Sequence, residues 1–231
     1  MAYKVYLSPE NRVAPHGKYW GYKNIYENDV CVDIADYCRI ALERCGFAVK
    51  VGKTGVKIQQ RVEEGIAWGA DYYMPIHTNA MGDGTKEGTA QGCLVLYYGG
   101  NKGASYKASG LVYKRLKEIY PYNKDRGLVA NTTFYEIIKT PMLAVYPECA
   151  FHDNGKDAKW LYENKEAIGE ALCKGVCDYY GVRYVEPVAN PNAGAVPNPE
   201  YDALVTECEA WKEKYNALVT RLKKLVQELG G

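Results

Sequence analysis

Apolar positions along the first 180 residues predict β-strands that alternate with α-helices. The predicted strands are short β-rich runs at 3–7, 48–51, 72–76, 93–98 and 142–146. Apolar residues three and four positions apart predict four helices. One begins at Glu27, and the others include 58–66, 111–119 and 157–180. This alternation predicts an α/β fold, with a mostly parallel sheet flanked by helices on both faces.

The pattern changes near residue 186. Residues 186–199 read EPVANPNAGAVPNP, a composition typical of an extended linker. Beyond them, apolar residues follow a coiled-coil heptad: Tyr201, Leu204, Cys208, Trp211, Tyr215, Leu218, Leu222, Leu225 and Leu229. The sequence therefore predicts a main domain at 1–185, a linker at 186–199 and a heptad-repeat helix at 200–231. We expect a homo-oligomer through 200–229. Packing of this helix on the main domain is the alternative, and the number of chains stays open.

Composition narrows the partners and the compartment. The 29 Lys and Arg nearly balance the 28 Asp and Glu, so the net charge of +1 gives no field to hold nucleic acid. No apolar run is long enough for a membrane span, and the first ten residues lack the apolar segment of a signal peptide, which predicts synthesis in the cytoplasm. The eight cysteines contain no CxxC pair. Those at helical spacing are expected to be reduced core residues: Cys31, Cys38, Cys45, Cys173 and Cys177.

Candidate chemistry gathers where the predicted strands end. His77 and Glu148 each follow an apolar strand, and the working site of a parallel sheet lies beyond the carboxyl ends of its strands. His152 lies four residues after Glu148, and Glu27 opens the first helix. Each has an ordinary structural alternative, such as a histidine bonded to a loop carbonyl or a carboxylate that stabilises a helix N-terminus.

Taken together, these segments resemble a known family. The evidence is the helix that opens with Glu27, the strand end Ile76-His77-Thr78-Asn79-Ala80, Arg126-Gly127, and the apolar run from Thr140 to Glu148. This order resembles the zinc-dependent N-acetylmuramoyl-L-alanine amidases that cut peptidoglycan, over roughly residues 3–182. The resemblance implies an α/β fold and one Zn²⁺ ion, with Glu27 and His77 as zinc ligands and Glu148 as the catalytic base.

The chain departs from the family pattern after the first strand. The family usually has a zinc-binding histidine there, and Asn11 stands in its place. Asparagine is a poor zinc ligand, so His152 or His16 is expected to complete the site, with His152 favoured. Water in that position, or a site without zinc, are the alternatives. Asn79 and Arg126 are expected to contact substrate, although Arg126 would equally suit a structural salt bridge.

The resemblance implies hydrolysis of the bond between N-acetylmuramic acid and L-alanine, with peptidoglycan as the partner. Such an enzyme acts as an endolysin or autolysin and would reach the wall after cell lysis or through a holin-type pore. The first alternative is a metal-free, non-catalytic wall-binding or assembly protein. Another zinc peptidase or esterase is the second, and it differs only in the bond that it cuts.

Overall fold

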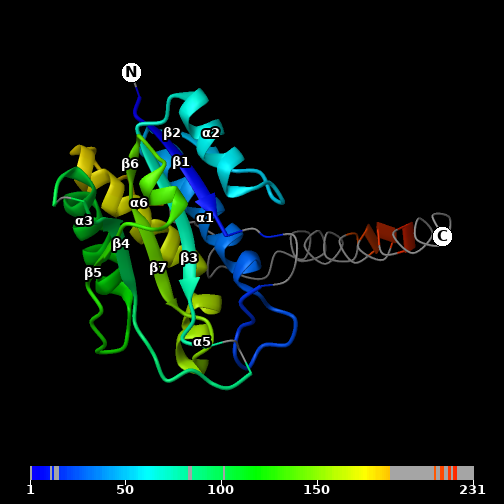
Figure 1. The fold of residues 1–231 in the computed structure, drawn as a ribbon. Helices are drawn as coiled ribbons and strands as arrows, with labels where there is room; N and C mark the ends of the chain where they lie inside the picture. Colours follow the sequence, from blue (N-terminus) through cyan, green and yellow to red (C-terminus); the bar gives the residue numbers. More distant parts are fainter. Residues whose placement is uncertain are drawn as a thin grey trace, which may run out of the picture. The chain divides into compact units, whose positions relative to one another are not determined.

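The computed structural model describes residues 2–10, 12, 16–82, 85–100, 102–187, 211, 214–215, 218–219 and 221–222. The chain divides into two compact units, Met1–Pro187 and Val188–Gly231. The first unit contains the sheet, the helices packed on it and the candidate site (Figure 1).

A seven-stranded sheet forms the centre of the first unit. Its main path runs β2-β1-β3-β7-β4-β5, and β6 pairs with β3 beside β7. The strands are β1 (Lys4–Pro9), β2 (Ala48–Val51), β3 (Tyr72–Asn79), β4 (Leu94–Tyr98), β5 (Leu128–Asn131), β6 (Leu143–Ala144) and β7 (Tyr146–Phe151). The described strand pairs are parallel except β4 with β7. The predicted α/β class with a mostly parallel sheet is therefore confirmed.

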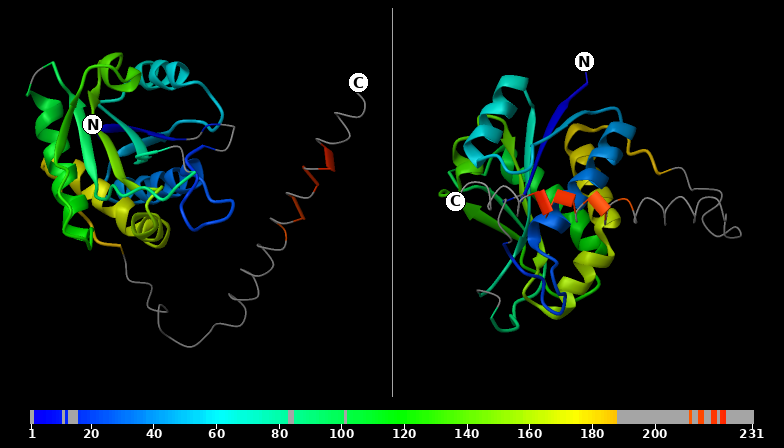
Figure 2. Two further views of the ribbon diagram at one scale, coloured as in Figure 1. Left: turned by 60° about the horizontal axis from the view of Figure 1, so that its bottom comes forward. Right: turned by 90° about the vertical axis from the view of Figure 1, so that its right-hand side faces the viewer.

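Helices cover both faces of this sheet. They are α1 (Glu27–Arg44), α2 (Ile58–Trp68), α3 (Ala104–Ile119), α4 (Tyr135–Ile138), α5 (Gly155–Glu163) and α6 (Lys165–Tyr180). α6 packs between α1 and α3 on one face, and α2 and α4 lie together on the other (Figure 2). The larger core lies under α1, α3 and α6, where apolar side chains of the helices meet those of the strands. Burial of this apolar area is the main force that holds the layers together.

Two segments differ from the prediction. The helix expected at 157–180 is two helices, because Asn164 leaves the helical path and its side-chain amide donates to the Trp160 carbonyl. The strand expected at 142–146 is replaced by β6 and β7, which pair with different parts of β3. The short elements β5 and α4 were not predicted.

The described residues of the second unit, which lie between 211 and 222, are helical. The side chains of Trp211, Tyr215, Leu218 and Leu222 are exposed. Residues 188–199 of the predicted linker lie outside the described residues, and so does most of the predicted heptad helix. The coiled coil therefore stays a prediction. Among the described residues, no helix is long and apolar enough to cross a membrane.

Candidate active site

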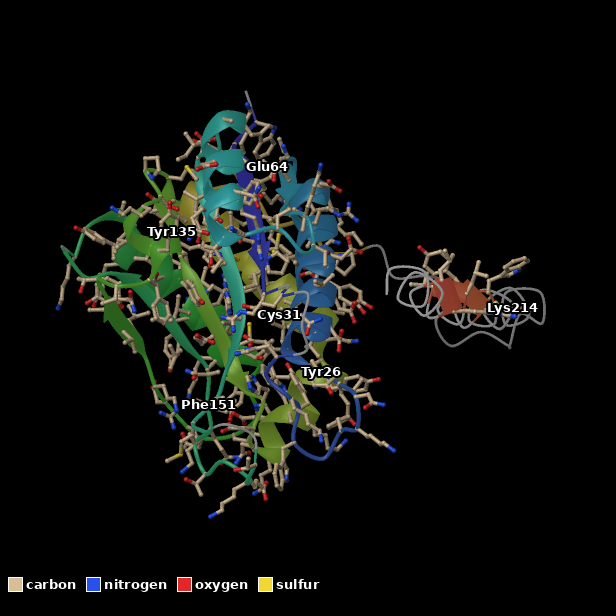
Figure 3. The ribbon with its side chains drawn as sticks, turned by 45° about the vertical axis from the view of Figure 1, so that its right-hand side comes forward. Tyr26, Cys31, Glu64, Tyr135, Phe151 and Lys214 are labelled. Atoms are coloured by element: carbon tan, nitrogen blue, oxygen red, sulfur yellow. The ribbon has the colours of Figure 1, made fainter. Side chains whose placement is uncertain are left out.

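A cavity of about 600 Å³ lies at the carboxyl ends of β1, β3 and β7. The loop before α1 and the first residue of α1 form its other wall. Figure 3 marks this region with Tyr26, which precedes α1, and Phe151, which ends β7. Six residues that the sequence predicted as site residues line the cavity together: His16, Glu27, His77, Asn79, Glu148 and His152.

Three potential metal ligands converge inside this cavity. Glu10, Glu27 and His77 each offer one ligand atom, and these atoms all lie within 4.8 Å of one another. His77 Nδ1 is 3.2 Å from Glu27 Oε1 and 3.7 Å from Glu10 Oε2. All three residues are buried. Two carboxylates and one imidazole on three separate elements form a donor set that suits a divalent cation.

Glu10 was not predicted as a ligand. The ligand position after the first strand was expected at Asn11, where the family has its histidine, and Asn11 lies outside the described residues. Glu10 directly follows β1, and its backbone N–H donates to the Ile76 carbonyl at 2.9 Å, so the sheet pairing continues to this residue. The signal in the sequence was a carboxylate immediately after a buried strand, next to the position where the family has its histidine.

Buried polar side chains hold the end of β1 in place. Ser8 Oγ donates to Glu136 Oε1 at 2.5 Å, and Tyr73 Oη donates to the same oxygen at 2.9 Å. Arg61 Nη1 donates to Ser8 Oγ at 2.8 Å and to the Pro9 carbonyl at 2.6 Å. This network fixes the backbone immediately before Glu10, as outer-sphere hydrogen bonds do in metal sites.

Glu27 reaches the cavity from the first turn of α1. The Thr78 backbone N–H donates to its Oε1 at 3.0 Å, and its own backbone N–H donates to the carbonyls of His16 and Gly17. Gly17 has φ of +64°, and a Cβ there would lie 2.9 Å from both Glu27 Oε2 and His152 Cε1. Burial raises the pKa of Glu27, but the hydrogen bond and charge of His77 outweigh it, so the pKa is lowered and the carboxylate is ionised.

His77 lies between the two carboxylates. Burial alone would lower its pKa, but the hydrogen bond to Glu27 and the nearby negative charges raise the pKa to about 9. The imidazole therefore carries a proton at neutral pH when no cation is bound. A cation that binds there has to displace this proton, because a coordinating imidazole is neutral.

Glu148 on β7 lies directly beside His77 on the neighbouring strand β3. The sequence placed both residues just after strands, and this is wrong: they lie within β3 and β7 and pair in register. Glu148 Oε2 is buried and has no hydrogen-bond partner among the described residues. Burial raises the pKa of Glu148 to about 8, with further contributions from Glu27 and Glu10. A carboxyl group of this kind is poised to exchange a proton.

The other two histidines also line the cavity, but they do not belong to the three-ligand group. His16 Nδ1 lies 3.3 Å from Glu27 Oε2, and the His16 side chain is half exposed. His152 is buried, with Nδ1 2.9 Å from Thr78 Oγ1 and its ring stacked on Tyr19. Burial lowers the pKa of His152, which favours a neutral imidazole.

The two expected substrate-binding residues are placed differently. Asn79 lines the cavity, and its Oδ1 accepts a hydrogen bond from the Ala80 backbone N–H. Arg126 is not among the residues that line this cavity. Its Nε donates to the Gln91 carbonyl at 2.5 Å, and its guanidinium lies 4.4 Å from the centre of the Phe151 ring. These contacts suit a structural role, and the substrate contact of Arg126 stays a prediction.

Comparisons with known proteins point to one family. Residues 14–178 match the model of a family described as N-acetylmuramoyl-L-alanine amidase. Among curated proteins, the N-acetylmuramoyl-L-alanine amidase LytC of Bacillus subtilis (strain 168) is 29% identical over 168 residues. That match covers 68% of this chain and 32% of LytC, so the chain spans about a third of that relative.

Solved amidase structures share the fold. The N-acetylmuramoyl-L-alanine amidase AmiC2 of Nostoc punctiforme matches 78% of this chain and 97% of its own, with a TM-score of 0.69 and 22% identity. The N-acetylmuramoyl-L-alanine amidase from Clostridium difficile 630 covers the same shares, with a TM-score of 0.67 and 23% identity. At this identity, the structures are evidence for the fold alone.

Proposed function

The chain belongs to the N-acetylmuramoyl-L-alanine amidase family, and from this premise we propose that it hydrolyses the amide bond between N-acetylmuramic acid and L-alanine in peptidoglycan. The observation that carries the proposal is the buried group of Glu10, Glu27 and His77, which shares one cavity with the hydrogen-bond-deficient carboxyl of Glu148. The biological role would be cell-wall degradation of the endolysin or autolysin type.

We propose that this group holds one Zn²⁺ ion. Imidazole and carboxylate are both zinc ligands, and three protein ligands leave a fourth position for water or substrate, as catalytic zinc sites do. The spacing of the three ligand atoms, within 4.8 Å of one another, supports a shared ion. Glu10 takes the third place that the sequence assigned to His152 or His16. His16 and His152 then line the cavity outside the ligand set.

The residues around the ion divide the chemistry. When bound, a divalent cation would polarise the scissile carbonyl and make a nearby water more acidic. Glu148 would take a proton from that water and pass it to the nitrogen of the leaving L-alanine. Added positive charge in the cavity lowers the pKa of Glu148 from about 8, so that the carboxylate is ionised near neutral pH and acts as a base.

Product analysis of digested peptidoglycan tests the reaction. Amidase activity produces new alanine amino termini and free lactyl groups, whereas new reducing sugars would mean that the enzyme is a glycosidase. Glu148→Gln should keep the ion and lose nearly all turnover, because it removes the base and preserves the side-chain shape. Glu63→Gln is the matched control on an exposed glutamate. Retained turnover in Glu148→Gln would remove Glu148 from the mechanism.

Elemental analysis tests the ligand set. Glu10→Ala and His77→Ala should lose zinc, whereas His16→Ala and His152→Ala should retain it. Full zinc occupancy in Glu10→Ala would refute the assignment of Glu10. A wild-type protein without zinc and without turnover would favour the metal-free, non-catalytic wall-binding alternative.

We also propose that residues 200–229 join several copies of the chain. The support is that Trp211, Tyr215, Leu218 and Leu222 occupy predicted heptad core positions and are exposed. Several catalytic units on one assembly would bind a polymeric wall with higher avidity. Analytical ultracentrifugation should give a particle mass of several chains for the intact protein and of one chain for a protein that ends at Glu186. Equal monomeric masses would contradict the proposal.

A further inference from the structure

Three buried thiols meet far from the cavity, where the ends of two helices pack together. Cys45 caps the C-terminus of α1, and Cys173 and Cys177 lie one turn apart near the C-terminus of α6. Cys173 Sγ is 3.9 Å from both Cys45 Sγ and Cys177 Sγ. All three sulfur atoms lie within 4.8 Å of one another. We propose that these thiols form a second metal site, for a thiophilic closed-shell cation such as Zn²⁺, Cd²⁺ or Cu⁺.

The sulfur spacing matches what such a cation needs. With a metal–sulfur bond of about 2.3 Å, sulfurs lie about 3.8 Å apart in tetrahedral geometry and about 4.0 Å apart in trigonal geometry. Two of the three sulfur separations, at 3.9 Å, fall between these values, and the third, between Cys45 and Cys177, is within 4.8 Å. A disulfide would instead require the sulfurs to approach to about 2.05 Å. Soft thiolate ligands select soft cations.

The local charges favour a cation as well. The last carbonyls of a helix carry partial negative charge, and the C-terminal ends of α1 and α6 both lie here. The Val185 backbone N–H donates to Cys45 Sγ at 3.3 Å, a hydrogen bond that stabilises a thiolate. The positive charge of Arg44 is offset by its ion pair with Glu170 at 2.6 Å.

A cavity touches one member of this group, Cys45. A cavity of about 210 Å³ is lined by Cys45 together with the segments around Tyr3, Phe47 and Val182. Cys45 is 9% exposed, whereas Cys173 and Cys177 are almost completely buried. The cavity gives a cation entry at Cys45 and gives a water molecule room to serve as a fourth ligand. Ligand identity, spacing, supporting hydrogen bonds and an entry path are the features expected of a metal site.

This site is independent of the amidase proposal. Its ligands are all sulfur, whereas the cavity at β1, β3 and β7 offers oxygen and nitrogen. A bound cation would connect the end of α1 to α6 and to the segment that holds Val185. It would stabilise the main unit without any contact with Glu148.

Cadmium titration of the reduced full-length chain tests the proposal. Cys208→Ser serves as the background, because it removes the one cysteine outside the described residues. We expect one equivalent of Cd²⁺ to produce a thiolate-to-metal charge-transfer band. Cys173→Ala should lose this band and bind Cd²⁺ through sulfur at least about tenfold more weakly. Cys93→Ala, a buried cysteine elsewhere, and Glu10→Gln should retain it.

Absence of the band in the background protein, or its persistence in Cys173→Ala, would overturn the proposal. Circular dichroism checks that each variant folds. Should Cys173→Ala fail to fold, ¹¹³Cd NMR of the background protein decides: a resonance typical of three sulfur ligands supports the site, and only an oxygen- and nitrogen-type resonance refutes it. Loss of the oxygen- and nitrogen-type resonance alone in Glu10→Gln would show that the two sites are separate.

Discussion

Glu148 should lower the stability of the cation-free protein, and Glu148→Gln should raise it. The wild-type carboxyl has a pKa of about 8 in the folded protein, against 4.5 for an ordinary glutamate. The folded state therefore keeps a proton that the unfolded state releases, and its stability falls as the pH rises from 4.5 to about 8. A glutamine has the same shape and no proton to lose, so the variant escapes this loss.

The size of the effect at pH 7 follows from the difference between that pH and the pKa of 4.5 of an ordinary glutamate. Each pH unit between the two pKa values costs about 1.4 kcal/mol, so a fully buried group would lose about 3 kcal/mol at pH 7. Glu148 is partly exposed on an open cavity, and solvent screening reduces that figure. We expect Glu148→Gln to be more stable than wild type by about 2 kcal/mol at pH 7. The advantage should vanish near pH 4.5 and reach its plateau above pH 8.

Urea denaturation in the presence of a chelator measures this difference at several pH values. His77 titrates over an overlapping range of pH, because its pKa is raised from 6.5 to about 9. Its contribution to stability is therefore fully present below pH 6.5 and is lost as the pH rises through 9. Because both proteins contain His77, the difference between them reports Glu148 together with its charge interaction with His77. Glu63→Gln, on the surface, should show no such pH dependence. A Glu148→Gln variant that is less stable than wild type, or whose advantage does not change with pH, would refute the reasoning.

Three further predictions follow from the site and the packing. Binding of Zn²⁺ at pH 7 should release about two protons, one from His77 and one from Glu148, measured by calorimetry in buffers of different ionisation enthalpy, and Glu148→Gln should reduce the release to about one. Glu10→His should shift the ratio of dissociation constants for Mn²⁺ and Zn²⁺ towards zinc, and an unchanged ratio would argue against Glu10 as a ligand. Gly175→Ala should lower the free energy of unfolding by about 1–3 kcal/mol, because the new Cβ would lie 2.6 Å from Val112 Cα. Gly110→Ala is the control: its Cβ would lie 3.7 Å from Leu128 Cδ1, an ordinary contact, so the free energy of unfolding should rise by up to about 1 kcal/mol.

The sequence predicted those parts of the fold whose local pattern agrees with their packing. α1 begins at Glu27 as expected, because its buried residues recur at helical spacing and glycine follows its C-terminal cap. The break at Asn164 was not predicted, because a polar residue fits the exposed face of a longer helix equally well. β5 was missed because it is short and only half buried, so its position depends on pairing with β4.

The site was predictable where single residues stand out and not where register decides. His77 and Glu148 were selected from their own neighbourhoods, but only the pairing of β3 with β7 places them side by side. Glu10 was missed because a shift of one residue after a strand decides which side chain enters the cavity. Arg126 was expected at the substrate because of its motif, yet its nearest partners are Gln91 and Phe151.

With the proposed ligand set, charge balance explains how the carboxylate of Glu10 could replace the histidine that the family usually has one residue later. Glu10 and Glu27 lie against the same imidazole, and in the cation-free protein the proton on His77 supplies the positive charge between them. A divalent cation that replaces this proton adds one net positive charge and cancels both carboxylates. Glu148 then remains as an acidic group beside the site, and its raised pKa of about 8 means that it holds its proton near neutral pH before the cation binds. On the proposed mechanism, the same set of residues would therefore exist in two states, one with a protonated imidazole and one with a cation, and the exchange between them would prepare Glu148 to act as a base.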